Sequence, residues 1–239
     1  MHTGTLYGVG VGPGDPDLIT IKGVKVLNSV DVIFAASSSK NNYSHAVDIV
    51  SIHLKKDIPI NILKFPMTRE RKILENAWHH NAKQIIKTLK DGKDAAFLTL
   101  GDPLTYSTFG YIMKSIKSLY SEAVIKIIPG ITAFNAATAC IKRELVEAEE
   151  SFAVVSGACG PEKLKNVIEH VDSVVVLKVY RKYREILSVI DEMGLSSASV
   201  LVSNCTTDRE MIVNDLNEGV DFQPGYFSLL LIRKKWLNE

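Results

Sequence analysis

Short apolar runs alternate with amphipathic segments along most of the chain. The runs have the length and β-branched content of buried strands, and the segments between them carry apolar residues at helical spacing. This alternation is typical of α/β domains in which helices cover a largely parallel sheet. Strands are predicted from Leu6 onward and at 32–36, 60–63, 95–100, 124–128, 152–156, 174–179, 200–202 and 227–232. Helices are predicted at 18–28, 68–91, 109–119, 134–141, 162–170 and 183–193.

The same pattern predicts two α/β domains. The polar stretch Tyr120-Ser121-Glu122 marks a boundary, so the domains are expected at 1–120 and 121–239. The spacing of the last strands is like that of hairpins, which favours a mixed second sheet beside a mostly parallel first one. The acidic segment 144–151 is expected to be solvated.

One strand ends in a way that indicates a binding site. The apolar run 95–100 breaks at Gly101-Asp102-Pro103 and continues into hydroxyl side chains. Glycine permits close approach of a ligand to the main chain, and proline keeps the preceding aspartate out of the helical region. Open α/β sheets bind ligands at this carboxyl edge. A simple strand-to-helix turn is the alternative, and a second break, Pro129-Gly130-Ile131-Thr132, follows the next strand.

The amino-terminal strand also ends in a glycine-rich loop. Glycines occupy positions 8, 10, 12 and 14, but Pro13 interrupts the dinucleotide fingerprint and no Gly-Lys-Ser/Thr follows for a phosphate loop. The loop is therefore expected either to bring backbone close to a ligand or to serve as a tight turn.

Composition excludes several classes of function. A net charge of +1 provides no overall attraction for nucleic acid or an anionic membrane. The three cysteines are widely spaced, and His79 and His80 are adjacent on a helix, so no metal site is predicted. No signal peptide or membrane-spanning run is evident, so a cytoplasmic protein is expected.

The ordered motifs resemble those of the tetrapyrrole methylase family. They are G-V-G-P-G-D-P-D-L-I-T near the start, L-G-D-P near residue 100 and P-G-I-T-A near 130. The resemblance implies a cytosolic homodimer of two α/β domains with S-adenosylmethionine in the cleft between them. Further segments, L-T-L-G-D-P-L-T-Y-S-T, L-K-V-Y-R and G-Y-F-S-L-L-L, are most similar to the precorrin-2 C20-methyltransferases.

The resemblance also implies the cofactor-binding residues. Pro13 matches the loop proline that borders the cofactor, and the remaining positions match the strand ends and turns that hold it. These positions are Leu100, Gly101, Asp102, Thr105, Thr132, Ala133, Val179, Tyr180 and Cys205.

The expected substrate is a polyacid ring, cobalt-factor II or cobalt-precorrin-2, in cobalamin biosynthesis, with cobalt present only inside the ring. Tyr226 is a candidate to pack on the flat face of the ring. The candidates to bind its carboxylates are the basic residues Lys40, His45, Lys64, Arg69, Arg181 and Arg184. The sirohaem-forming relatives have an aspartate where this chain has Ala36, which puts a carboxylate base in doubt. The candidates to accept the proton that leaves the methylated carbon are then water, a substrate carboxylate and Tyr106.

Other functions stay open at this point. Metal-free precorrin-2 is an alternative substrate, and a diphthine synthase-like enzyme that methylates a protein is an alternative methylase. A carrier that binds a tetrapyrrole without S-adenosylmethionine is the non-enzymatic alternative, and a generic nucleotide-binding α/β protein is the remaining one.

Overall fold

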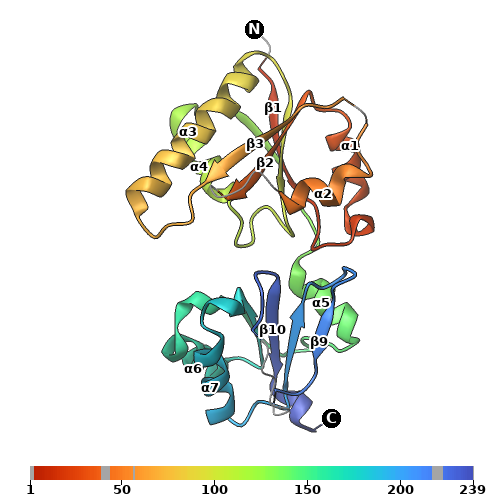
Figure 1. The fold of residues 1–239 in the computed structure, drawn as a ribbon, viewed down its shortest axis with the longest axis vertical. Helices are drawn as coiled ribbons and strands as arrows, with labels where there is room; N and C mark the ends of the chain where they lie inside the picture. The colour runs from red at the N-terminus through yellow and green to blue at the C-terminus, as the bar shows by residue number, and fades with distance from the viewer. Residues whose placement is uncertain (1–2, 39–43, 56, 217–222, 239) are drawn as a thin grey trace. The chain divides into compact units, whose positions relative to one another are not determined.

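A computed structural model describes residues 3–38, 44–55, 57–216 and 223–238. The chain forms two compact units, Met1–Thr132 and Ala133–Glu239, each with its own sheet and helices (Figure 1). The division falls after Thr132 and not after residue 120, because the strand at 124–128 pairs with the first strand of the chain.

The first unit contains a five-stranded parallel sheet in the order β3-β2-β4-β1-β5. Its strands are β1 (Thr5–Gly10), β2 (Val32–Ser38), β3 (Ile60–Phe65), β4 (Ala95–Thr99) and β5 (Val124–Ile128). Because all five run in one direction, their carboxyl ends meet at one edge of the sheet. The predicted mostly parallel sheet is confirmed.

Helices cover both faces of this sheet (Figure 1). They are α1 (Ile21–Leu27), α2 (His45–Ser51), α3 (Arg71–Lys90) and α4 (Phe109–Leu119). One core lies between the sheet and α3 with α4, where Phe97 and Phe109 are fully buried. A second core lies under α1 and α2 around Leu27 and Val50. Helices on both faces explain why the central strand β4 reads as a continuous apolar run.

Two details of this unit differ from the prediction. The first helix begins only at Ile21, because Asp15 caps a separate turn at Pro16–Leu18 and the Thr20 side chain accepts a hydrogen bond from the Gly23 N–H at 3.0 Å. Helix α2 was not predicted. It forms because Ile49 and its apolar neighbours are buried against the sheet.

The second unit has a mixed sheet in the order β6-β7-β10-β8-β9. Its strands are β6 (Phe152–Ser156), β7 (Ser173–Leu177), β8 (Ser199–Ser203), β9 (Met211–Val213) and β10 (Ser228–Arg233), and its helices are α5 (Ala133–Ile141), α6 (Pro161–His170) and α7 (Tyr183–Glu192). Strand β6 is parallel to β7, whereas β10 is antiparallel to both β7 and β8. The prediction of a mixed second sheet is confirmed, although the short strand β9 was not predicted.

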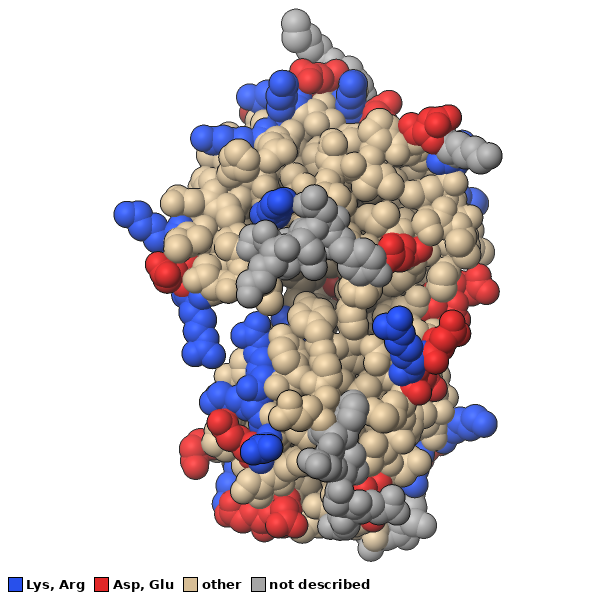
Figure 2. All heavy atoms as spheres, in the orientation of Figure 1, with Lys and Arg blue, Asp and Glu red and all other residues tan. Residues whose placement is uncertain are grey.

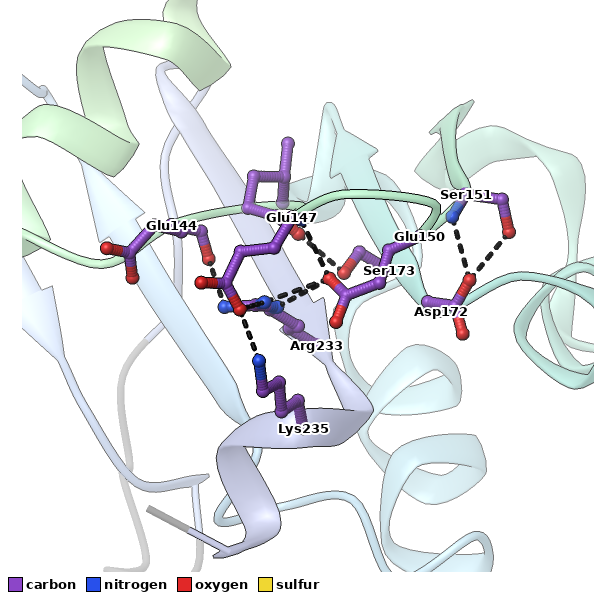
Figure 3. Close-up of polar contacts among 9 residues, drawn as sticks. Glu144, Glu147, Glu150, Ser151, Asp172, Ser173, Arg233 and Lys235 are labelled. Carbon is purple, nitrogen blue, oxygen red and sulfur yellow. Dashed lines mark hydrogen bonds and ion pairs between the residues drawn. The ribbon is translucent and has the colours of Figure 1, made fainter.

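The acidic segment after α5 is more than a solvated loop. Arg233, at the end of β10, has no exposed surface, and its guanidinium bonds Glu147 at 2.6 Å and Glu150 at 2.9 Å (Figure 3). Its Nη1 also donates to the Glu144 carbonyl at 3.1 Å, and Lys235 contacts Glu147. The acidic segment therefore supplies the partners of a buried cation, which the sequence pattern did not reveal.

Charges of both signs are mixed on the surface, in keeping with the net charge of +1 (Figure 2). On the face drawn in Figure 2, basic and acidic side chains appear together on each unit. In the described part of the chain, no helix is both long and apolar enough to cross a membrane.

Candidate functional site

Three glycines bring three strand ends of the first sheet into backbone contact. They are Gly10 at the end of β1, Gly101 after β4 and Gly130 after β5. A Cβ atom on Gly130 would lie 2.1 Å from the Gly101 carbonyl oxygen, and one on Gly10 would lie 2.5 Å from the same atom. Because no side chain fits there, the three breaks form one continuous backbone surface at the carboxyl edge.

A backbone bridge joins the first two of these loops. Gly101 donates to the Gly12 carbonyl at 2.8 Å, and Gly12 donates back to Gly101 at 3.4 Å. Both glycines have positive φ, +84° at Gly12 and +63° at Gly101, which other residues rarely adopt. Pro13 follows Gly12 directly in the chain and so comes next to this bridge.

Asp102 ties the second and third breaks together. Its Oδ2 accepts the Gly130 N–H at 3.2 Å, and its Oδ1 accepts the Leu104 N–H at 2.9 Å and the Thr105 hydroxyl at 3.3 Å. Asp102 is partly exposed, and because Oδ1 already accepts two hydrogen bonds and Oδ2 only one, Oδ2 retains a lone pair for a ligand. Asp102 thus orders both loops and presents negative charge at their junction. The structure brings together Leu100, Gly101, Asp102 and Thr105, and Thr132 lies two residues beyond Gly130.

The hydroxyl-rich segment after Asp102 is also ordered. Thr99 and Ser107 lie 2.7 Å apart through their hydroxyl oxygens, and Ser107 accepts the Phe109 N–H at 3.0 Å at the start of α4. Between them Tyr106 has a φ of +51° and is 49% exposed. Left-handed backbone at a bulky residue costs free energy and tends to persist at functional positions.

The second unit gathers aromatic and basic side chains at one sheet edge. Because β10 runs against β7, the residues before β10 meet those after β7. The Tyr180 and Tyr226 rings are 5.6 Å apart, and Phe227 meets Tyr226 edge to face at 5.1 Å. The Arg181 guanidinium lies over the Tyr180 ring, and its Nε donates to the Tyr180 hydroxyl at 3.2 Å. Tyr226 remains 55% exposed, so its ring offers an accessible flat face.

Lys178 is a feature of this edge that sequence reasoning missed. It precedes the predicted pair Val179 and Tyr180, and its backbone is left-handed with a φ of +57°. Burial, and then the nearby Arg181 charge, lower the pKa of the Lys178 ammonium. Lys178 belongs to the segment L-K-V-Y-R, but its left-handed backbone and the close approach of its carbonyl to Gly157 are tertiary features that the sequence does not reveal.

The predicted residues Ala133 and Cys205 also meet. The Cys205 thiol points to the Ala133 carbonyl at 3.8 Å and is almost fully buried. Burial raises the pKa of Cys205 to about 12, so the thiol is protonated at neutral pH. Glu210 lies beside this pair and contacts Cys140 and Thr206, and it too was missed.

The basic residues predicted for the substrate are dispersed. Lys64 lies at the carboxyl end of β3, on the same edge as Asp102, and its side chain is exposed. His45 begins α2, and Arg69 and Arg184 are exposed elsewhere in their units. Lys40 lies outside the described residues. In the described ranges, no three His, Cys, Asp or Glu side chains come together as metal ligands.

The order of the sequence motifs along the two-unit fold is that of the tetrapyrrole methylases. The family model for tetrapyrrole (corrin/porphyrin) methylases matches residues 5–218. The chain belongs to this family.

Relatives within the family match nearly the whole chain. The cobalt-precorrin-2 C(20)-methyltransferase of Salmonella typhimurium is 31% identical over 234 residues, 98% of each chain. A probable cobalt-precorrin-2 C(20)-methyltransferase of Methanocaldococcus jannaschii is 31% identical over 96% of each chain. The precorrin-2 C(20)-methyltransferase of Sinorhizobium sp. is 28% identical and covers 97% of this chain and 96% of its own.

Solved structures share the fold. A cobalt precorrin-4 methyltransferase of cobalamin biosynthesis gives a TM-score of 0.72 at 24% identity, covering 97% of this chain and 95% of the other. A uroporphyrin-III C-methyl transferase from Thermus thermophilus, solved with S-adenosyl homocysteine, gives 0.65 at 19% identity over 98% of this chain and 99% of the other. The predicted family and fold class are confirmed.

Proposed function

We propose that this protein is an S-adenosylmethionine-dependent methyltransferase that methylates C20 of cobalt-factor II or cobalt-precorrin-2 in cobalamin biosynthesis. The proposal depends above all on one observation, the hydrogen bond that joins Asp102 after β4 to Gly130 after β5. This bond joins two of the three motifs that carry the family resemblance. The full-length similarity to C20-methyltransferases supports the choice of substrate.

The residues at this edge fit such a cofactor. S-adenosylmethionine carries a sulfonium, an ammonium and ribose hydroxyls; the Asp102 carboxylate offers negative charge to the two cations and, with neighbouring backbone carbonyls, hydrogen-bond acceptors to the ammonium and the hydroxyls. A Cβ on Gly101 would come no closer than 3.8 Å to the Ile131 carbonyl and 3.9 Å to the Thr132 Cα. The space beside Gly101 is therefore bounded by the two loops and not filled by a side chain.

When bound, S-adenosylmethionine supplies a methyl group on a sulfonium, and the thioether that leaves is neutral. No general acid is needed, so the task of the chain is alignment. The hydrogen bond between Asp102 and Gly130 fixes two loops against each other. Less conformational entropy is therefore lost when the bound reactants are aligned. Alignment of this kind contributes up to about 7–11 kcal/mol in favourable intramolecular reactions.

The substrate is held by charge and by a flat surface. The candidates to bind its carboxylates include Lys64, which is exposed at the carboxyl end of β3, and Arg181, whose guanidinium lies over the Tyr180 ring. The exposed Tyr226 ring, buttressed by Tyr180 and Phe227, provides an apolar face for the macrocycle.

One proton leaves the carbon after methylation. Tyr106 stays the candidate acceptor on the chain, because its exposed ring follows Asp102 by four residues in a strained turn. The alternative is that water or a substrate carboxylate accepts this proton.

A labelled-methyl assay tests the function and separates the alternatives. The full chain is incubated with methyl-labelled S-adenosylmethionine and either cobalt-factor II or metal-free precorrin-2, and the methyl is located by mass spectrometry and NMR. Label at C20 of the cobalt substrate is expected. Faster labelling of precorrin-2 assigns the metal-free branch, and labelling only of a protein from a lysate indicates the diphthine-type activity. Tetrapyrrole binding without cofactor binding indicates a carrier.

We also propose that the protein is a cytoplasmic homodimer. The family resemblance motivates both parts of this proposal. Sedimentation equilibrium is expected to give twice the mass of 26.4 kDa, and cell fractionation is expected to place the protein with soluble cytoplasmic enzymes.

A further inference from the structure

A strained turn follows β8 in the second unit. Asn204 and Thr206, on either side of Cys205, have positive φ values of +48° and +64°. Asparagine tolerates the left-handed region, but a β-branched residue such as threonine is a true outlier there. Such strain persists only where the surroundings hold the backbone in place.

Three sets of hydrogen bonds hold this turn. The Asn204 N–H donates to the Phe227 carbonyl at 2.8 Å, just before β10. The Cys205 thiol reaches the Ala133 carbonyl at the start of α5. The turn thus touches the aromatic edge and the first residue of α5, which are two of the predicted binding segments of this unit.

Glu210 supplies the third restraint through one oxygen. Its Oε2 accepts the Thr206 N–H at 2.7 Å and the Cys140 thiol at 3.0 Å, and Cys140 belongs to α5. Hydrogen bonds to an ionised acceptor are stronger than neutral ones. A single carboxylate therefore joins the strained residue to the helix that begins at Ala133.

We propose that Glu210 is a positioning residue of the cofactor site, which holds the Cys205–Thr206 backbone in the left-handed turn that presents it to S-adenosylmethionine. This inference depends on the proposed function, because Cys205 and Ala133 are cofactor residues only in that function. Glu210 itself touches the turn and α5 and has no contact with the reacting atoms in the proposal.

Calorimetric titration of the full chain with S-adenosylhomocysteine tests the role of Glu210. Glu210→Ala is expected to raise the dissociation constant about tenfold, because the Thr206 N–H and the Cys140 thiol lose their common acceptor. Glu210→Gln is expected to bind like the wild type, because the amide oxygen still accepts from Thr206. Glu192→Ala is the matched control; it removes another glutamate of this unit, one that bonds Lys165 at 2.5 Å, and should leave affinity unchanged.

The titration also separates positioning from a loss of folded protein. An irreversibly misfolded fraction lowers the stoichiometry and leaves the dissociation constant unchanged, whereas a displaced turn raises the constant; a reversible unfolding equilibrium would raise it tenfold only if about nine-tenths of the chain were unfolded, which circular dichroism detects. Thr206→Gly in the Glu210→Ala background adds a second test, because glycine adopts this φ without strain. The double variant is expected to recover part of the lost affinity.

Two results overturn the inference in different ways. Wild-type affinity in Glu210→Ala, with the wild type binding normally, shows that Glu210 is unnecessary and leaves the proposed function standing. A wild type that binds neither S-adenosylmethionine nor its product removes the proposed function itself, and the inference with it.

Discussion

The two oxygens of Asp102 perform separate tasks. One orders the turn into α4 through Leu104 and Thr105, and the other reaches the Gly130 N–H on the next loop. A carboxylate is suited to this because it accepts hydrogen bonds at both oxygens and donates none. Asp102 therefore affects binding through loop position as well as through its charge.

Asp102→Ala is expected to weaken S-adenosylhomocysteine binding by at least about tenfold while the chain stays folded. Asp102→Asn is expected to be nearly as weak, because its amide would present a donor to the Gly130 N–H. Calorimetry measures the affinity, and circular dichroism melting checks the fold. Unchanged affinity in both variants would count against the site.

The two thiols near the strained turn are expected to be unreactive. Burial raises the pKa of Cys205 to about 12, and burial followed by the hydrogen bond to Glu210 raises the pKa of Cys140. At pH 8 neither is a thiolate, which is the form that attacks electrophiles. Iodoacetamide labelling followed by peptide mass spectrometry should modify the partly exposed Cys159 first. Rapid labelling of Cys205 would contradict this picture.

At this scale the sequence is informative only where neighbours in space are also neighbours in the chain. The turn at Asp102 can be predicted from Gly-Asp-Pro, because Asp102 bonds Leu104, which is only two residues away in the chain. Glu210 and Cys140 are separated by 70 residues, and nothing in either local pattern links them. The cofactor roles assigned from resemblance remain predictions.

Among the elements, the link between β10 and the acidic segment is the one with the clearest energetic consequence. Glu150→Ala removes two hydrogen bonds from the fully buried Arg233 and is expected to cost about 2 kcal/mol of unfolding free energy. Urea denaturation measures the change. Burial makes this ion pair matter more than the exposed pairs of the chain.

Glu149→Ala provides the matched control for this comparison. Glu149 is the exposed neighbour in the same acidic segment, so its loss is expected to change stability by less than about 0.5 kcal/mol. Equal effects of the two substitutions would show that the guanidinium does not depend on Glu150.

Most elements were predictable because buried β-branched runs have few alternatives. The strands β5 and β6 match their predicted bounds, 124–128 and 152–156. Helix α2 was missed because it is short and follows a long polar stretch, and β9 because it has only three residues. The length of an element, more than its composition, decided whether it could be predicted.

For the whole molecule, acid is expected to weaken the second unit before the first. Hydrogen bonds from Lys235 and then Arg233 lower the pKa of Glu147, and bonds from the Ser151 backbone and hydroxyl lower that of Asp172. A carboxyl with a lowered folded pKa stabilises the protein above its unfolded value near 4. That contribution is lost as the pH falls through the folded pKa.

Hydrogen exchange with mass spectrometry at pH 6 and pH 3 measures this difference. Corrected for the intrinsic exchange rate, protection of β7 and β10 is expected to fall at pH 3 more than protection of β1 and β4. A greater loss in the first unit would contradict the assignment of the acid-sensitive groups.

The division into two α/β units was predictable, but its position was not. Tyr120-Ser121-Glu122 has the composition of a linker, yet it only joins α4 to β5 within one unit. Strand pairing across the sheet, which a local pattern does not encode, assigns β5 to the first unit.

The contact of Gly10, Gly101 and Gly130 limits how this protein can be re-engineered. Binding pockets are commonly enlarged by replacing a side chain with a smaller one, but these three residues are glycines and have no side chain to shorten. A variant that accepts a bulkier sulfonium, such as an allyl or propargyl donor for labelling chemistry, must gain its room at the rim, from Thr105 or Thr132. Libraries for such a purpose should therefore leave the three glycines fixed.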